Sequence, residues 1–217
     1  MVSGAKDTFR VTPEYQPQVR AVELTGEGVF TSPRIKPWRS LPDRQNCTLD
    51  FEFEGKPVRW HVKRYPASLN RLTPAEVEFN GAAMLTTAGI ATVQIVAWGV
   101  LADRRSFIVT RDLDGFMPAD KMVEARGNFD RLLMPTADLA AKLHNANLHH
   151  RDLYLCHFMA KDSPQGVELA LIDTARVASL KRFFTRGRWI VKDISQFWYS
   201  LTKLPINGEQ REAWIKR

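Results

Sequence analysis

Residues 149–162, HHRDLYLCHFMAKD, bring together several side chains that could do chemistry. His150, Arg151 and Asp152 are consecutive, and His157 follows the aspartate by five positions. Three interpretations suit this pattern: the catalytic loop of a phosphoryl-transfer enzyme, a pair of metal ligands, or a polar turn without chemistry. The rest of the chain has to supply the partners that distinguish them.

A phosphoryl-transfer site needs a small set of groups in a fixed order. A strand lysine holds the nucleotide phosphates and pairs with a helix carboxylate, a loop aspartate accepts the proton of the attacking hydroxyl, and a second aspartate after a strand holds magnesium. The chain supplies Lys63, Glu78, Asp152 and Asp173 in this order. Each residue alone is weak evidence, because lysines on strands and glutamates on helices are commonly solvated. The complete set on matching elements is much harder to obtain by chance and predicts phosphoryl transfer.

His157 departs from the usual protein-kinase motif, in which an asparagine at this position binds a second magnesium ion. Imidazole is a poor magnesium ligand. His157 is therefore a candidate for the phosphate or metal position beside Asp173, for a hydrogen-bond donor to Asp152, or for a satisfied buried histidine. A zinc site built on His150 and His157 is a minor alternative, because no third ligand has a recognisable motif.

The elements that must position these residues can be read from periodicity and capping signals. Residues 1–46 are rich in proline and glycine and indicate loops with short strands. Beyond them the pattern predicts an α+β chain with a sheet-rich first half and a helical second half. The expected elements are a hairpin of strands 47–53 and 58–64, a helix from Pro74 to about Thr87 with Thr73 as N-cap, strands 91–101 and 106–113, a helical stretch over 120–147 interrupted near Pro135, a strand over 167–173, and a helix over 189–201.

Composition limits the class of protein and its partners. The chain has 217 residues, 44% hydrophobic and 25% charged, with a net charge of +7 and a pI near 9.6. Such a basic protein favours anionic partners: nucleic acid, anionic lipid or a phosphorylated glycolipid. Its two cysteines form no CxxC pair, its first residues lack an apolar signal segment, and the uncharged run 80–102 is too polar to span a membrane. We expect a cytoplasmic protein, with room for peripheral association at the inner face of the cytoplasmic membrane.

One segment resembles a known family closely. Residues 143–159, LHNANLHHRDLYLCHFM, resemble the signature of the lipopolysaccharide kinase family of the Kdo/WaaP type, in which HRDLYLCHF is itself typical. His157 thus matches this family although it departs from ordinary protein kinases. The resemblance extends over roughly residues 25–205, through VKRY (62–65), EVEFNGAAMLTTAGIATV (76–93), SFIVTRDL (106–113), LIDTARV (171–177) and VKDISQFWYS (191–200).

The resemblance implies a protein-kinase-like bilobal fold, with an N-terminal antiparallel sheet lobe that carries one helix and a shortened, mainly helical C-terminal lobe. It implies ATP and Mg²⁺ as cofactors. Asp152 would be the catalytic base, accompanied by Arg151 and His150, and Asp193 would be a structural aspartate that tethers the catalytic loop. The expected division is an N-terminal extension over 1–24 and a kinase-like domain over 25–217, with its lobes at about 25–110 and about 114–217.

The function that the resemblance implies is transfer of the γ-phosphate of ATP to a sugar hydroxyl, on a heptose or Kdo, of the lipopolysaccharide inner core. Two alternatives stay open: a kinase with a protein or small-molecule acceptor, and a non-catalytic member that binds ATP. Two features depart from the family pattern. There is no GxGxxG, since GEGVFTSPR (26–34) is only loosely glycine-rich, and the chain ends soon after the last recognised helix.

A basic and aromatic segment is the expected contact for the acceptor. KRFFTRGRWIVK (181–192) carries five cations among three aromatic side chains and no acid, and RIKPWR (34–39) is a weaker patch of the same kind. Such a segment suits an anionic glycolipid or a membrane interface. Single-stranded nucleic acid would also suit it and is the less favoured partner. A solvated loop with core aromatics is an equally good interpretation.

Overall fold

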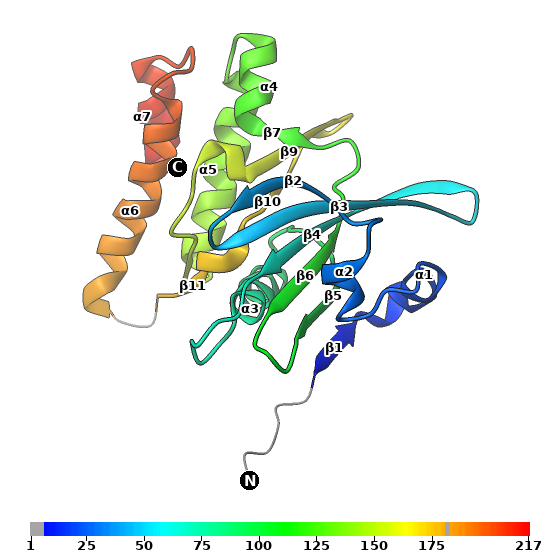
Figure 1. Cartoon of the computed structure of the whole chain (residues 1–217). Coiled ribbons are helices and arrows are strands. Elements are labelled where there is room, and N and C mark those ends of the chain that lie inside the picture. The colour runs from blue at the N-terminus through cyan, green and yellow to red at the C-terminus, as the bar shows by residue number, and fades with distance from the viewer. Residues whose placement is uncertain (1–6, 181–182) are drawn as a thin grey trace. The chain divides into compact units, whose positions relative to one another are not determined.

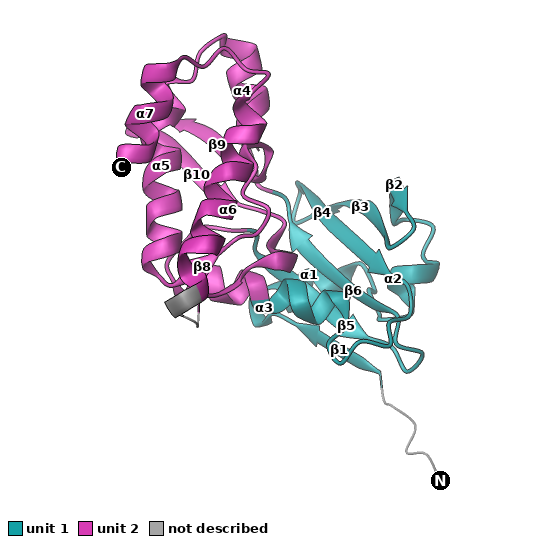
Figure 2. Ribbon diagram, turned by 90° about the vertical axis from the view of Figure 1, so that its left-hand side faces the viewer, with its two compact units in different colours: residues 1–80, 93–112 teal, residues 81–92, 113–217 magenta. Residues whose placement is uncertain are grey.

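The computed structural model describes residues 7–180 and 183–217 (Figure 1). The chain forms two compact units, coloured separately in Figure 2, and the division falls inside helix α3 (Pro74–Thr87). Unit 1 consists of Met1–Asn80 and Val93–Asp112, and unit 2 of Gly81–Thr92 and Leu113–Arg217.

Unit 1 is built on a six-stranded antiparallel sheet with the strand order β1-β5-β6-β4-β3-β2. Its strands are β1 (Thr8–Val11), β2 (Lys36–Leu41), β3 (Arg44–Phe53), β4 (Lys56–Tyr65), β5 (Ile95–Val100) and β6 (Ser106–Arg111). β1 pairs with β5, so part of the segment 1–24 contributes to this sheet.

The expected hairpin is confirmed as β3 and β4. Glu54 and Gly55 join the strands, and both have positive φ angles, 50° and 71°. A two-residue turn with two positive φ angles matches the twist of the strands it connects. The resulting register places Leu49 opposite Trp60, and both side chains are buried.

Two small cores cover the two faces of the sheet in unit 1. On one face, buried strand residues such as Trp60 and Phe107 pack with Val19 and Val29. The latter come from short helices that the sequence did not predict, α1 (Gln16–Ala21) and α2 (Gly28–Thr31), which follow the turn η1 (Pro13–Tyr15). On the other face, Tyr65 packs in a cluster with the beginning of α3.

Helix α3 begins and ends as the sequence predicts. The Thr73 backbone N–H donates to Glu76 Oε2 at 2.7 Å, which is one half of a capping box. At the other end Gly89 has a φ of 66° and the Ile90 N–H donates to the Leu85 carbonyl. Glycine is favoured there because a left-handed residue closes the helix.

Unit 2 surrounds one hydrophobic core with helices and two small sheets, ordered β10-β9-β7 and β11-β8. Phe197 and Trp214 stack in this core with ring centroids 4.3 Å apart. Its elements are β7 (Met117–Pro118), α4 (Ala119–Arg126), α5 (Asp130–Asn145), β8 (Leu148–His149), η2 (Leu155–His157), β9 (Phe158–Ser163), β10 (Gly166–Leu171), η3 (Thr174–Arg176), β11 (Ala178–Ser179), α6 (Phe183–Leu201) and α7 (Gly208–Lys216).

Several expected boundaries were wrong. The break in the 120–147 helical stretch lies at Gly127, which ends α4 with a φ of 70°, and Pro135 lies inside α5. Helix α6 begins at Phe183 rather than at residue 189, so most of the basic segment is helical and not a loop. Strand β9 was not predicted, because its sequence FMAKDS shows little alternation. None of the helices in the described part of the chain is long and apolar enough to cross a membrane.

Candidate active site

In unit 1, strand β4 presents Lys63 to a buried carboxylate on α3. Lys63 Nζ donates to Glu78 Oε1 at 2.5 Å, and Tyr65 Oη donates to the other oxygen, Oε2. The Glu78 side chain is 4% exposed, whereas that of Lys63 is 27% exposed. Because a buried charge is costly unless it is paired, this arrangement holds both side chains in place. A lysine held in this way presents a fixed positive charge.

The expected glycine-poor phosphate loop is not a loop between strands. Residues 28–31 of the segment GEGVFTSPR form the helix α2. The turn nearest the Lys63 end of β4 is instead Pro42-Asp43, which connects β2 to β3. Asn46, near the beginning of β3, lies opposite Lys63, so the turn and Lys63 are at the same end of the strands. This turn contains no glycine, so a glycine-motif search could not find it.

In unit 2, the HRD segment follows β8 as a loop, and a buried aspartate holds the backbone of this loop. Asp193 of α6 is fully buried, and its two oxygens accept hydrogen bonds from the backbone N–H groups of His150 and Arg151, both at 2.8 Å. His144 Nε2 lies 3.2 Å from the same carboxylate. The structure thus shows the tether expected of Asp193.

Two residues of the candidate site have unusual backbone conformations. Arg151 has a φ of 67°, and Asp173 lies in the left-handed region with φ 58° and ψ 59°. Such conformations are costly for residues other than glycine and persist where surrounding bonds enforce them. His150 is fully buried and its Nε2–H donates to the Ile172 carbonyl at 3.0 Å. Burial, followed by the nearby His157, lowers the pKa of His150.

His157 lies between the backbone of Asp152 and the carboxylate of Asp173. Its Nδ1–H donates to the Asp152 backbone carbonyl at 2.6 Å, and its Nε2 lies 3.7 Å from Asp173 Oδ2. Burial alone would lower the pKa of His157, but the hydrogen bonds with Cys156 and the Asp152 carbonyl and the charge of Asp173 raise it to about 9. The ring therefore acts as a brace between the loop and Asp173.

The Asp152 carboxylate has two side-chain partners that the sequence did not suggest. Arg176 Nη1 donates to Oδ1 at 3.0 Å and to Oδ2 at 3.2 Å. Gln196 Nε2 donates to Oδ1 at 3.3 Å and also to the Tyr154 hydroxyl at 3.3 Å. These partners lie 24 and 44 positions from Asp152, so no local motif could have identified them.

The Asp173 region fits a magnesium ion bound partly through phosphate. The Asp173 side chain is 34% exposed and offers hard carboxylate oxygens, and magnesium is commonly held by one or two carboxylates together with substrate phosphates. Within residues 7–180 and 183–217, no group of three or more His, Cys, Asp or Glu side chains is arranged to hold a metal ion by itself. Asp173 is backed by α3, because a Cβ on Gly81 would lie 1.9 Å from the carbonyl oxygen of Thr174.

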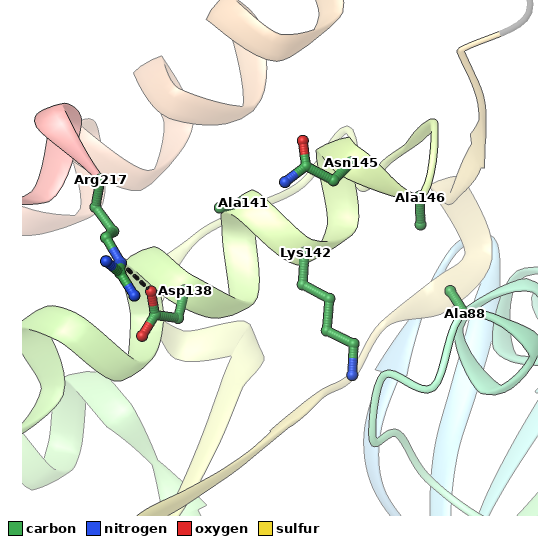
Figure 3. A pocket seen from close by; sticks show the side chains of 7 residues that line it. All are labelled: Ala88, Asp138, Ala141, Lys142, Asn145, Ala146 and Arg217. Carbon is green, nitrogen blue, oxygen red and sulfur yellow. Dashed lines mark hydrogen bonds and ion pairs between the residues drawn. The ribbon is translucent and has the colours of Figure 1, made fainter.

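The structure thus brings together Lys63 and Glu78 in unit 1 and, in unit 2, Asp152, His157 and Asp173. A hollow elsewhere in unit 2 contains none of these residues (Figure 3). It is lined in part by Asp138, which pairs with Arg217, and by Lys142. Nothing in its lining matches the phosphoryl-transfer set.

Comparisons with known proteins agree with the motif order. The model of the lipopolysaccharide kinase (Kdo/WaaP) family matches residues 44–217. The lipopolysaccharide core heptose(I) kinase WaaP of Pseudomonas aeruginosa is 31% identical over 204 residues, which cover 83% of this chain and 75% of that protein. The enzyme of the same name from Escherichia coli is 28% identical over 207 residues, covering 82% and 74%.

A solved structure shows the fold. The Cydia pomonella granulovirus kinase PK-1 matches with a TM-score of 0.52 at 13% identity, covering 91% of this chain and 78% of that one. This likeness confirms the protein-kinase-like fold expected from the sequence. Because the family model spans most of the residues, including those of the candidate site, the chain belongs to the lipopolysaccharide kinase (Kdo/WaaP) family.

Proposed function

We propose that the protein transfers the γ-phosphate of ATP to a sugar hydroxyl, on a heptose or Kdo, of the lipopolysaccharide inner core. The observation that carries the chemistry is the brace in unit 2, where His157 contacts the Asp152 carbonyl at 2.6 Å and lies 3.7 Å from the Asp173 carboxylate. Family membership supports a phosphotransferase, and the names of the relatives support a lipopolysaccharide acceptor. Between the two sugars, those names favour heptose.

Each candidate residue has a role in this proposal. Lys63, held by Glu78, binds the nucleotide phosphates, and Asp152 accepts the proton of the sugar hydroxyl. Asp173 holds magnesium, which neutralises charge on the phosphates when it is bound. His150 and Arg151 fix the shape of the loop, because their backbone N–H groups donate hydrogen bonds to Asp193. His157 holds the loop beside Asp173.

The acceptor would approach the basic part of α6. The Trp189 ring lies 4.4 Å from the Arg151 guanidinium, 5.7 Å from that of Arg188 and 5.4 Å from Lys192 Nζ. Cations around an aromatic ring suit a sugar that carries phosphate or carboxylate groups. Lys181 and Arg182, which belong to the same expected patch, lie outside the described residues. Val191 is 62% exposed on the same helix, which supports peripheral association with the inner face of the cytoplasmic membrane.

The test is a transfer assay with γ-labelled ATP, Mg²⁺ and two truncated lipopolysaccharides, one with Kdo as its last core sugar and one extended by heptose. Label should enter only the heptose-extended acceptor if heptose is phosphorylated, and should also enter the Kdo-terminated acceptor if Kdo is. Asp152→Asn should lower kcat by about 10²–10⁴-fold, the usual contribution of a general base. Asp138→Asn is a matched control, because Asp138 is an exposed acid in the hollow of Figure 3. Full transfer by Asp152→Asn would refute the assignment of the base, and label in neither glycolipid would refute the proposed acceptor.

A further inference from the structure

Arg176 lies directly beside the candidate base. It ends the short helix η3, which begins immediately after Asp173. One nitrogen of its guanidinium, Nη1, contacts both Asp152 oxygens at 3.0 and 3.2 Å. Asp152 is thus linked to the Asp173 segment through a side chain as well as through His157.

Most of the Arg176 guanidinium is not used by this contact. In the part of the chain that the structure describes, its hydrogen bonds come from Nη1 alone. The side chain is 55% exposed, while that of Asp152 is 18% exposed. An exposed ion pair of this kind contributes little to stability. The Nε and Nη2 donors, by contrast, form a planar edge that matches the oxygens of a phosphoryl group.

The proposed chemistry places that phosphoryl group near Arg176. The hydroxyl that gives its proton to Asp152 must stand about 3–3.5 Å from the phosphorus it attacks. The metal carried by Asp173 contacts the same phosphate. A guanidinium that is bonded to Asp152 and lies three residues after Asp173 is therefore within reach of the γ-phosphate.

We propose that Arg176 is a further catalytic residue, which keeps Nη1 on Asp152 and uses Nε and Nη2 to bind the oxygens of the phosphoryl group in transit. This inference rests on the proposed kinase function. In the step, the sugar oxygen forms a bond to the γ-phosphorus and its proton passes to the Asp152 carboxylate. The bond between the γ-phosphorus and the bridging oxygen breaks, and its electron pair stays on ADP. Arg176 stabilises the charge that spreads over the phosphoryl oxygens, a role in which cationic side chains are most effective in the transition state.

Gln196 makes this role testable by substitution. Its amide also donates to Asp152 Oδ1, at 3.3 Å. When the Arg176 guanidinium is removed, Gln196 and the backbone tether on Asp193 still orient the loop. A loss of activity in an Arg176 variant can then be separated from a collapse of the loop.

The first measurement compares Arg176→Gln and Arg176→Lys with the intact protein. The glutamine variant should lose about 10²–10³-fold in kcat, the usual effect of removing one transition-state donor, with little change in either KM. The lysine variant should recover part of kcat, because it restores the charge without the planar fork. A normal kcat with a raised acceptor KM would overturn the proposal and make Arg176 a residue of acceptor recognition.

The second measurement needs no acceptor, so it separates this inference from the identity of the glycolipid. ADP with aluminium fluoride mimics the phosphoryl group in transit, and the intact protein should bind it more tightly than ADP in the presence of Mg²⁺. Arg176→Gln should lose most of that difference and keep its affinity for ADP. Arg126→Gln, which breaks the ion pair between Arg126 on α4 and Asp162 on β9, is the matched control and should retain the difference. If Arg176→Gln and the intact protein bind ADP with aluminium fluoride with equal affinity, the proposal is overturned.

Discussion

Single residues around the HRD loop are held by backbone contacts more than by their own side-chain chemistry. Asp193 accepts from two successive N–H groups, and the positive φ of Arg151 follows from that grip. Charge-assisted hydrogen bonds to a buried carboxylate are among the stronger ones in proteins. The loop therefore holds Asp152 in one conformation. A proposed base needs such a fixed position, because it must lie within hydrogen-bond distance of the acceptor hydroxyl.

His149, next to this loop, makes unit 2 sensitive to acid. Its side chain is buried and packs against Trp189, with ring centroids 4.8 Å apart and the ring planes tilted by 35°. Burial, followed by the charge of Arg151, lowers the pKa of His149 from 6.5 to about 4, against the opposing effect of Asp193. His144 and Lys192 lower it further. The folded protein thus holds a neutral imidazole where the unfolded chain would bind a proton.

The predicted consequence is a loss of stability as the pH falls. Between pH 6.5 and 4 the unfolded chain binds more protons at His149, so the stabilisation is complete above 6.5 and is lost towards 4. From pH 7.5 to 5 this group should remove about 2 kcal/mol from the free energy of unfolding, measured by denaturant titration. His149→Phe keeps a ring against Trp189 and should lose that share of the pH dependence. An unchanged pH profile in His149→Phe would contradict the prediction.

At the scale of elements, α3 does more than carry Glu78. Its second half belongs to unit 2, and Gly81 lets the helix lie against the carbonyl of Thr174, directly after Asp173. A side chain at residue 81 would occupy the space of that carbonyl oxygen. The helix thus fixes the segment that presents the proposed metal ligand, Asp173.

Gly81→Ala should therefore destabilise the protein although alanine favours helices. Its Cβ would lie 1.9 Å from Thr174 O, and such overpacking typically lowers the free energy of unfolding by about 1–3 kcal/mol. Activity should fall as well, because displacing the backbone of Thr174 would also move its neighbour Asp173. Gly187→Ala in α6 is the matched control, because nothing lies within 4 Å of its Cβ, and it should raise stability by up to about 1 kcal/mol. Denaturant titration of both variants checks the opposite signs, and two equal shifts would contradict the packing argument.

These elements also show what the sequence could predict. The β3–β4 hairpin and α3 were found because a turn, a cap and an alternating pattern are local signals. Lys63 and Glu78 were found through the order of the groups that phosphoryl transfer needs, and Asp193 through the family resemblance. The structure places each on the expected kind of element. The helices α1 and α2 were missed because short helices in a proline-rich segment depend on packing against the sheet.

Contacts between distant segments could not be predicted for the same reason. Tyr65 reaches Glu78, and both Arg176 and Gln196 reach Asp152, only after the chain has folded. Each of these residues is an ordinary strand, turn or helix residue in the sequence. Their proposed roles follow from the positions of their side chains in the folded chain, and nothing in the sequence alone singles out Arg176.

At the scale of the whole molecule, the chain is basic, and the helix where the acceptor is proposed to bind, α6, also carries an excess of cations. The net charge is +7, and the one acidic residue of α6, Asp193, is fully buried. The charges that α6 exposes are therefore positive. Electrostatic attraction of this kind guides a protein to an anionic surface and is screened by salt.

We therefore predict salt-sensitive binding to anionic vesicles that depends on α6. The Debye length falls from about 10 Å at 0.1 M salt to about 3 Å at 1 M, and each cation near such a surface is worth about 1 kcal/mol. Replacing Arg188 and Lys192 by Glu should weaken binding at low salt by at least about tenfold in a vesicle sedimentation assay. Lys121 and Lys216, which are exposed on α4 and α7, give a control pair with the same change in net charge.

Neutral vesicles should bind neither the intact protein nor the variants. If both pairs weaken binding equally, net charge alone guides the protein. If binding persists at 1 M salt, apolar contacts such as Val191 and Tyr199, both exposed on α6, carry the association instead.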